Sequence, residues 1–136
     1  MENIGGKLLF QLRDNKYGIP NPNKWGLFGG GMEQGETPVQ AVRREVKEEL
    51  GIDIKPSNLR LLFKKESNSS KRYVFYYKLQ KEQESFRLGE GQKYQFLSLR
   101  EIILKRNVVP SLRLFMIMYP LFKFKMCKLG GVLRHV

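Results

Sequence analysis

Three glutamates on one short segment could bind a divalent metal ion. Glu45, Glu48 and Glu49 fall within one turn of a predicted helix, so that their carboxylates crowd together. Helix propensity alone does not favour three like charges so close to one another. Carboxylate oxygens are the ligands that Mg²⁺ prefers, and bound Mg²⁺ often shares its coordination with substrate phosphates. The cluster therefore indicates metal-assisted attack of water on a polyphosphate. A solvated helix face with Glu–Lys and Arg–Glu pairs is the alternative interpretation.

A glycine-rich loop precedes the acidic segment. Gly29, Gly30 and Gly31 permit a close approach of the main chain to a metal or a phosphate, because they carry no side chain. Glu36 and Arg44 are opposite charges that could tie this loop to the helix. The loop makes the catalytic interpretation of the glutamates stronger than the surface interpretation.

The helix that must carry the glutamates has clear ends. Thr37 is a good N-cap with Gln40 as its capping-box partner, and Gly51 offers a left-handed C-terminal cap. These residues predict a helix from about Pro38 to Leu50. Its core-facing stripe is expected to be Val39, Val42, Val46 and Leu50.

The other expected elements alternate between strands and helices. Strands are predicted at residues 7–13, 58–64, 71–79 and 93–99, with a long loop at 14–24 and a turn at 66–70. Ser98 begins a capping box before a short helix, and Ser111 is expected to cap a last helix. Strands interspersed with helices predict an α/β fold, in which a mixed β-sheet is covered by helices on both faces.

The segment from Gly30 to Ile52 resembles the signature of the Nudix hydrolases. Its spacing is Gly, five residues, Glu, seven residues, and then Arg-Glu-apolar-x-Glu-Glu-x-Gly-apolar. The resemblance implies an α/β/α sandwich with a loop–helix–loop that binds Mg²⁺ or Mn²⁺ and cleaves a nucleoside diphosphate linked to another group. The residues that match the family's metal site are Gly30, Glu45, Glu48 and Glu49, and those that match its supporting salt bridge are Glu36 and Arg44.

The resemblance extends to both sides of this segment. Residues 8–14 and 25–30 look like the family's first strand and its approach to the glycine loop. Glu90 lies where many members carry a further acidic residue, which binds metal or acts as general base. An ordinary turn glutamate between two glycines is the other interpretation of Glu90. The candidate substrate contacts are Arg13, Trp25, Phe28 and Asn107, with core packing as the first interpretation of Trp25 and Phe28.

The substrate expected first is a nucleoside triphosphate, including an oxidised one, as in MutT-like members. A nucleoside diphosphate sugar, the 5′ end of an RNA, and a catalytically silent ligand sensor are the alternatives. Members that cleave ADP-ribose tend to carry a proline after the signature, and residues 66–70 contain none. Cys127 is badly placed for the catalytic cysteine of the Nudix-like isoprenoid isomerases.

Length and charge limit the remaining possibilities. A chain of 136 residues suits one domain, as a monomer or a homodimer. The single cysteine excludes an internal disulfide and, with no visible secretory leader, predicts a cytoplasmic protein. The lone His135 at the chain end makes a zinc site or a histidine-dependent nucleophile unexpected. The net charge is +12, and no acid follows Glu101, so the expected partner is a polyanion, namely the nucleotide substrate. RNA is possible but not expected, an anionic membrane surface could also be attracted, and a solubility charge with no particular partner is the other interpretation.

The C-terminal residues depart from a compact Nudix domain. We expect the domain to comprise residues 1–122, followed by a basic tail, 123–136, that extends the last helix or is flexible. The apolar run 112–124 is too short and too interrupted to span a bilayer. Residues 122–129 could instead lie on a membrane surface or a partner.

Overall fold

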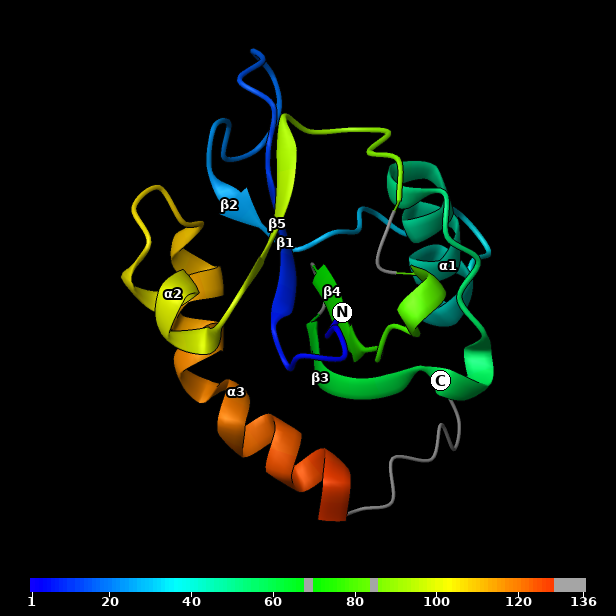
Figure 1. Ribbon diagram of the computed structural model, residues 1–136. Coiled ribbons are helices and arrows are strands. Elements are labelled where there is room, and N and C mark those ends of the chain that lie inside the picture. Colours follow the sequence, from blue (N-terminus) through cyan, green and yellow to red (C-terminus); the bar gives the residue numbers. More distant parts are fainter. Residues whose placement is uncertain (68–69, 84–85, 129–136) are drawn as a thin grey trace.

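The computed structural model describes residues 1–67, 70–83 and 86–128 (Figure 1). Two antiparallel sheets form its centre, one with the strand order β2-β1-β5 and one made of β3 and β4. The strands are β1 (Leu8–Leu12), β2 (Trp25–Gly26), β3 (Arg60–Ser67), β4 (Ser70–Tyr76) and β5 (Lys93–Leu97). The helices are α1 (Pro38–Leu50), α2 (Leu99–Leu104) and α3 (Pro110–Lys128), with 3₁₀ turns at Pro56–Asn58 and Lys81–Gln83.

The first residues of the chain join the two sheets. Glu2 pairs with Leu8 in β1 in an antiparallel bridge, and with Lys78 beyond β4 in a parallel bridge. A second parallel bridge links Trp25 to Val108. The mixed character of the sheet therefore comes from these single bridges, because the named strands pair only in the antiparallel sense.

Strand β1 divides the core into two layers. Leu8 and Phe10 point into a cluster shared with α2 and α3, whereas Leu9 points into a cluster shared with α1. Neighbouring side chains on a strand face opposite ways, so Gln11 falls on the α1 side with Leu9. Figure 1 shows α1 on one side of the sheets and α2 and α3 on the other, which is the expected layered α/β arrangement. A polar residue of β1 is thereby aimed at the helix that carries the glutamates.

Helix α1 has the bounds and caps that the sequence predicts. Thr37 and Gln40 form the reciprocal capping box, and Gly51 adopts the left-handed conformation with φ of 70°. Val46 and Leu50 are buried, and Val39 and Val42 pack against the same core cluster. The register of the helix, and with it the direction of each glutamate, follows from these local signals.

Several predicted boundaries differ from the structure, including the strand expected at 71–79, which ends at Tyr76. Helix α3 begins at Pro110, so Ser111 lies inside its first turn and does not cap it. Proline suits the first helical position because its missing N–H has no helical acceptor there. The β3–β4 hairpin is also longer than expected: Glu66 pairs with Lys71 and Ser67 with Ser70, so these residues belong to strands. The rest of the predicted turn, residues 68 and 69, lies outside the described residues.

Helix α3 continues through Pro120 to Lys128 and includes the first part of the expected tail. The buried carboxylate of Glu2 accepts a hydrogen bond from Tyr119 Oη at 3.3 Å and forms an ion pair with Lys123. These contacts fix the C-terminal helix to the start of the chain. Residues 129–136 lie outside the described residues, and the domain boundary at residue 122 stays a prediction.

Candidate active site

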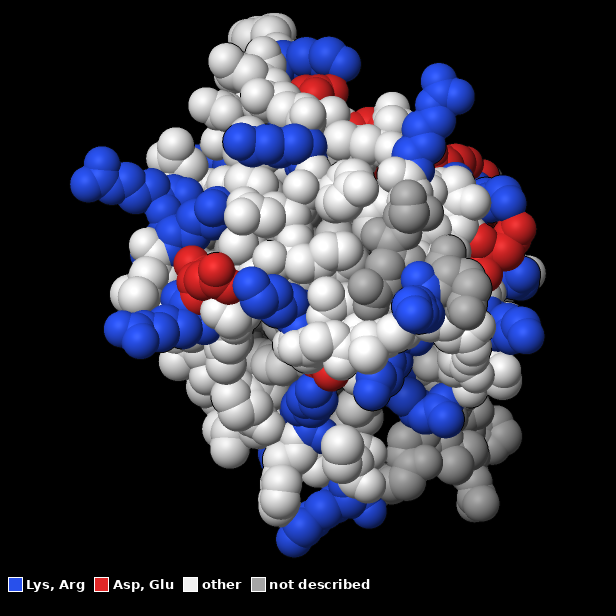
Figure 2. Space-filling view, in the orientation of Figure 1, with Lys and Arg blue, Asp and Glu red and all other residues white. Residues whose placement is uncertain are grey.

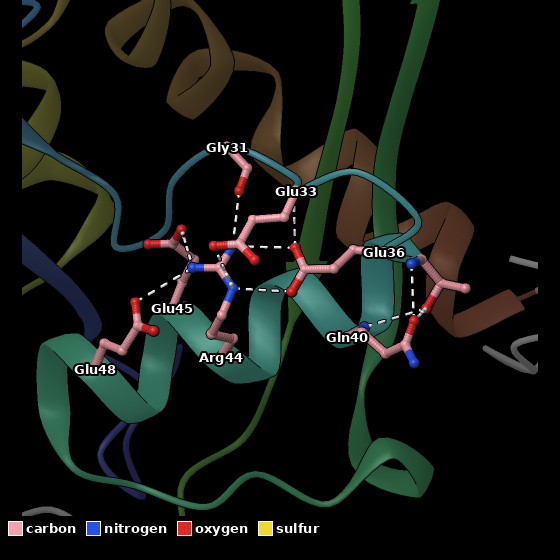
Figure 3. A network of polar contacts seen from close by, with 8 residues as sticks. Gly31, Glu33, Glu36, Gln40, Arg44, Glu45 and Glu48 are labelled. Carbon is pink, nitrogen blue, oxygen red and sulfur yellow. Dashed lines mark hydrogen bonds and ion pairs between the residues drawn. The ribbon is translucent and has the colours of Figure 1, made fainter.

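Arg44 holds the glycine loop against α1. Its guanidinium donates to both carboxylate oxygens of Glu36, at 2.8 and 3.0 Å, and to the carbonyl of Gly31 at 2.9 Å (Figure 3). The same side chain reaches Glu45 Oε1 at 2.8 Å and Glu48 Oε2 at 3.2 Å. A planar guanidinium suits this work because it presents its N–H donors as a rigid fork. The loop and the acidic face of the helix are thus joined through one residue.

The pKa values of Glu36 and Arg44 reflect the same contacts. Hydrogen bonds from Arg44, and then from the Glu33 main-chain N–H, lower the pKa of Glu36 from its ordinary 4.5 to about 2. Hydrogen bonds to Glu36 and Glu45 raise the pKa of Arg44. Both groups are therefore charged at neutral pH, and the salt bridge is fully formed there.

The Glu45 carboxylate lies directly against the main chain of Gly30. A β-carbon added at Gly30 would lie 2.5 Å from Glu45 Oε1 and 2.6 Å from Oε2, which no side chain can tolerate without movement. Gly30 therefore allows a carboxylate and a main-chain segment to meet at van der Waals contact. This is the close approach that the glycine loop predicts.

Glu49 is buried and holds the start of the loop. It is only 5% exposed, and its carboxylate accepts from the Gly29 main-chain N–H at 2.7 Å and from Gln11 Nε2 at 3.2 Å. Burial raises the pKa of Glu49, the charges of Glu45 and Glu90 act in the same direction, and the two hydrogen bonds oppose the shift. Glu49 is thus close enough to Glu45 and Glu90 for their charges to act on its carboxylate.

Glu90 is brought to the end of α1 by the glycines on both sides of it. The Gly89 N–H donates to the Glu49 carbonyl at 2.7 Å, and a β-carbon at Gly89 would lie 2.3 Å from the Glu48 carbonyl oxygen. Gly91 has φ of 85°, and a β-carbon there would lie 2.9 Å from Gln11 Oε1 and 3.1 Å from the Leu12 carbonyl oxygen in β1. The Gly-Glu-Gly sequence therefore places the exposed Glu90 beside the end of the helix that carries Glu45, Glu48 and Glu49, called here the box glutamates.

The arrangement fits a hard divalent cation. Among the described residues, no three acidic, histidine or cysteine side chains already converge into a metal cage. Glu48 is turned to solvent, with 57% of its side chain exposed. Mg²⁺ does not need such a cage, since it commonly binds one or two carboxylates together with water and substrate phosphate. Glu45 and Glu49, with the main chain at Gly30, offer the oxygen ligands that Mg²⁺ and Mn²⁺ take.

Two adjoining cavities meet at the glycine loop. One, of about 430 Å³, is lined by Glu45 and residues 29–32 and by β4. The other, of about 640 Å³, lies between the loop, the β3–β4 hairpin and α3. Gly29 and Gly30 belong to both cavities, and Glu45 lines the smaller one. Sites of this volume are typical for small molecules and cofactors.

The predicted substrate contacts are divided between cavity and core. Arg13 lines the larger cavity and donates to the Pro20 carbonyl at 2.9 Å, and Phe28 lines the smaller one. Trp25 instead lies in the core, 5% exposed, with Lys105 Nζ 4.6 Å from its ring centroid. Asn107 is exposed and accepts from the Trp25 N–H through its main-chain carbonyl. The structure therefore does not bring Trp25 or Asn107 to either of these two cavities.

A family model for the NUDIX domain matches residues 1–117. The chain belongs to the Nudix family. Solved structures share its fold: the MutT protein of Methanosarcina mazei Go1 has a TM-score of 0.66 at 24% identity, over 91% of this chain and 88% of that one. A protein of Deinococcus radiodurans gives 0.69 at 22% identity, over 87% and 77% of the two chains.

Curated relatives match over a shorter stretch. The nucleoside triphosphatase NudI of Enterobacter sp. (strain 638) is 47% identical over 51 residues, which are 38% of this chain and 35% of that protein. The same-named protein of Salmonella schwarzengrund is 49% identical over an equal stretch. The chain thus spans about a third of the relatives it matches.

Some residues of this Nudix site carry no motif of their own. Gln11 positions Glu49, but a glutamine in a strand has no distinctive spacing. The signal that could have identified Gln11 is its position two residues after Leu9, because side chains two residues apart on a strand lie on the same face. Arg72 and Phe115 line both cavities, although only the pairing of β3, β4 and α3 brings them there.

Proposed function

We propose that this Nudix protein is a Mg²⁺- or Mn²⁺-dependent pyrophosphohydrolase that converts a nucleoside triphosphate into the monophosphate and pyrophosphate. The observation that carries the proposal is the contact of the Glu45 carboxylate with Gly30, at the point where both cavities meet. A phosphate chain that leaves the larger cavity would cross Gly29 and Gly30 and come directly to the acidic face of α1.

The chain's own residues position the reacting groups. Glu49 fixes the Gly29 N–H, while Arg44 fixes the Gly31 carbonyl, so both ends of the glycine loop are held from α1. Such preorganisation lowers the cost of orienting a phosphate for in-line attack. A divalent cation bound by Glu45 and Glu49, with Glu48 as a further carboxylate, would neutralise phosphate charge and lower the pKa of an attacking water.

Glu90 is our candidate for the proton acceptor. It is exposed, so its carboxylate is free to turn toward a water at the phosphate, and its charge already reaches Glu49. Its main chain is held in place by Gly89 and Gly91. A box glutamate is the alternative acceptor.

The larger cavity supplies contacts for the nucleoside. Phe63, Phe115 and Phe122 form one aromatic cluster, with ring centroids 5.3 to 5.7 Å apart. Arg13 and Arg72 line the same cavity and are cations that can pair with phosphate oxygens. An apolar, aromatic wall beside two guanidinium groups suits a base at one end and a phosphate chain at the other.

The test is a substrate panel with Mg²⁺. Nucleoside triphosphates, oxidised nucleoside triphosphates, nucleoside diphosphate sugars, dinucleotide polyphosphates and a 5′-triphosphate RNA are compared by kcat/KM, with products separated by ion-exchange chromatography. We expect a nucleoside triphosphate to have the highest kcat/KM and to yield pyrophosphate. A preference for a diphosphate sugar or for the RNA would replace the proposed substrate. Binding of nucleotide without turnover of any compound would indicate a ligand sensor and overturn the proposal.

A further inference from the structure

Helix α3 is apolar on two opposite faces. One face packs on the sheet and buries Leu112, Met116 and Tyr119, each 7% exposed or less. The opposite face carries a second apolar row, called here the outer stripe. Each member lies three or four residues from another member, and all are 39 to 65% exposed: Leu114, Ile117, Met118, Leu121 and Phe124. A surface helix usually shows polar residues on this side, so a contiguous exposed apolar row indicates a binding surface.

Lysines extend the outer stripe at its C-terminal end. Lys125 follows Leu121 by four residues and Lys128 follows Phe124 by four, so both lie on the same side of the helix. Lys128 Nζ sits 4.7 Å from the centroid of the Phe124 ring. Figure 2 shows Lys and Arg side chains at the lower edge of the molecule, where Figure 1 places the end of α3.

Negative charge is scarce near this surface. The sequence has no acid after Glu101, and Glu2, the acid that contacts α3, is buried and already paired with Lys123. A second copy of the chain would bring the same lysines together, and the net charge of +12 would oppose the contact. A binding partner with an apolar interior and an anionic surface complements both the apolar outer stripe and the lysines at its end.

We propose that the outer stripe of α3 binds the surface of an anionic lipid bilayer. The apolar side chains would enter the boundary between headgroups and acyl chains, while Lys125 and Lys128 contact anionic headgroups. The helix would lie flat, because its inner face stays fixed to the domain through Tyr119, Lys123 and Glu2. Within the described residues, no helix is long and apolar enough to cross a membrane. Leu114 and Met118 also line the larger cavity, so docking would bring the mouth of that cavity to the headgroup region.

The experiment is flotation of the full chain with vesicles of phosphatidylcholine alone or with about 30% phosphatidylglycerol, at low and at physiological salt. We expect binding to the anionic vesicles and little to the neutral ones. The pair Ile117→Gln and Leu121→Gln removes apolar area at constant charge and should lower the partition coefficient at least about tenfold. Lys125→Gln and Lys128→Gln should each lower it about fivefold.

Matched controls separate this binding from general charge attraction. Tyr17→Gln removes a fully exposed aromatic from the loop at the opposite end of the molecule and should bind as the wild type does. Melting curves should be unchanged for all variants, because every altered side chain is exposed. Equal binding by the Ile117→Gln/Leu121→Gln protein would overturn the proposal, since charge alone would then suffice. No vesicle binding, together with a concentration-dependent dimer that the same pair abolishes in sedimentation equilibrium, would assign the stripe to a second copy instead.

Discussion

Replacing Gly30 by alanine tests whether the Glu45 carboxylate must touch the glycine loop. The new β-carbon would lie 2.5 Å from Glu45 Oε1, whereas ordinary contacts begin at 3.4 Å, so the carboxylate must retreat by about 0.9 Å. Displacing a catalytic group by about 1 Å costs on the order of 100-fold in rate, or about 2.7 kcal/mol of transition-state stabilisation. We therefore expect Gly30→Ala to lower kcat/KM for a nucleoside triphosphate about 100-fold.

Gly31→Ala is the matched control for this substitution. An added β-carbon there meets no atom within 4 Å, and neither Gly30 nor Gly31 has a positive φ. Alanine is thus compatible with both backbones, and the two variants should differ only in the contact with Glu45. Steady-state kinetics with Mg²⁺, with melting temperature as a folding check, compare the three proteins. Activity of Gly30→Ala within about twofold of Gly31→Ala would refute the claim that this contact positions Glu45.

Three further predictions concern the residues around this contact. Arg44→Lys should lower kcat/KM at least about tenfold, because an ammonium cannot hold both Glu36 oxygens and the Gly31 carbonyl. The control is Arg43→Lys, which changes a single hydrogen bond to the Ile54 carbonyl. Equal kinetics for the two variants would contradict the role of Arg44. Glu90→Gln should lower kcat about 100-fold and leave Mn²⁺ affinity, measured by electron paramagnetic resonance, unchanged, as expected for a general base. Replacement of the exposed Asp53 by asparagine is the control. A kcat of Glu90→Gln within twofold of the wild-type value would show that Glu90 takes no part in the chemistry. Finally, the pKa of Glu36 is about 2 in the folded protein and 4.5 ordinarily, so the unfolded chain binds more protons between these values. The stability that Glu36 provides is present above pH 4.5 and is lost as the pH falls toward 2. The difference in melting temperature between wild type and Glu36→Gln should therefore shrink over that range, and a constant difference would contradict the assignment.

The sequence predicts helix α1 well because its signals are local. Thr37, Gln40 and Gly51 act within a few residues of their partners, so their effect does not depend on the rest of the fold. The end of β3 was harder to predict, since the pairing of Glu66 with Lys71 needs the partner strand and leaves no mark in composition.

The candidate site also combines local contacts, which the sequence predicts, with tertiary contacts, which it does not. The roles proposed for Arg44 and the box glutamates rest on their spacing in the sequence, because one helix and the loop before it are enough to bring these residues together. Gln11 and Arg72 join them from elements far away in the chain, through strand pairing and packing that their neighbours in sequence do not reveal. Contacts that depend on tertiary assembly were therefore outside the reach of the motif.

Glu45, Glu48 and Glu49 are proposed to support metal-dependent cleavage of a nucleoside triphosphate. The most direct measurement is kcat for release of pyrophosphate with Mg²⁺ by the wild type and by Glu49→Gln, which keeps the side chain's size and an acceptor for the Gly29 N–H. We expect turnover by the wild type and a loss of at least about 100-fold in the variant, because the carboxylate charge proposed to bind the cation is gone. A Glu49→Gln protein that works at nearly the wild-type rate would contradict the proposal.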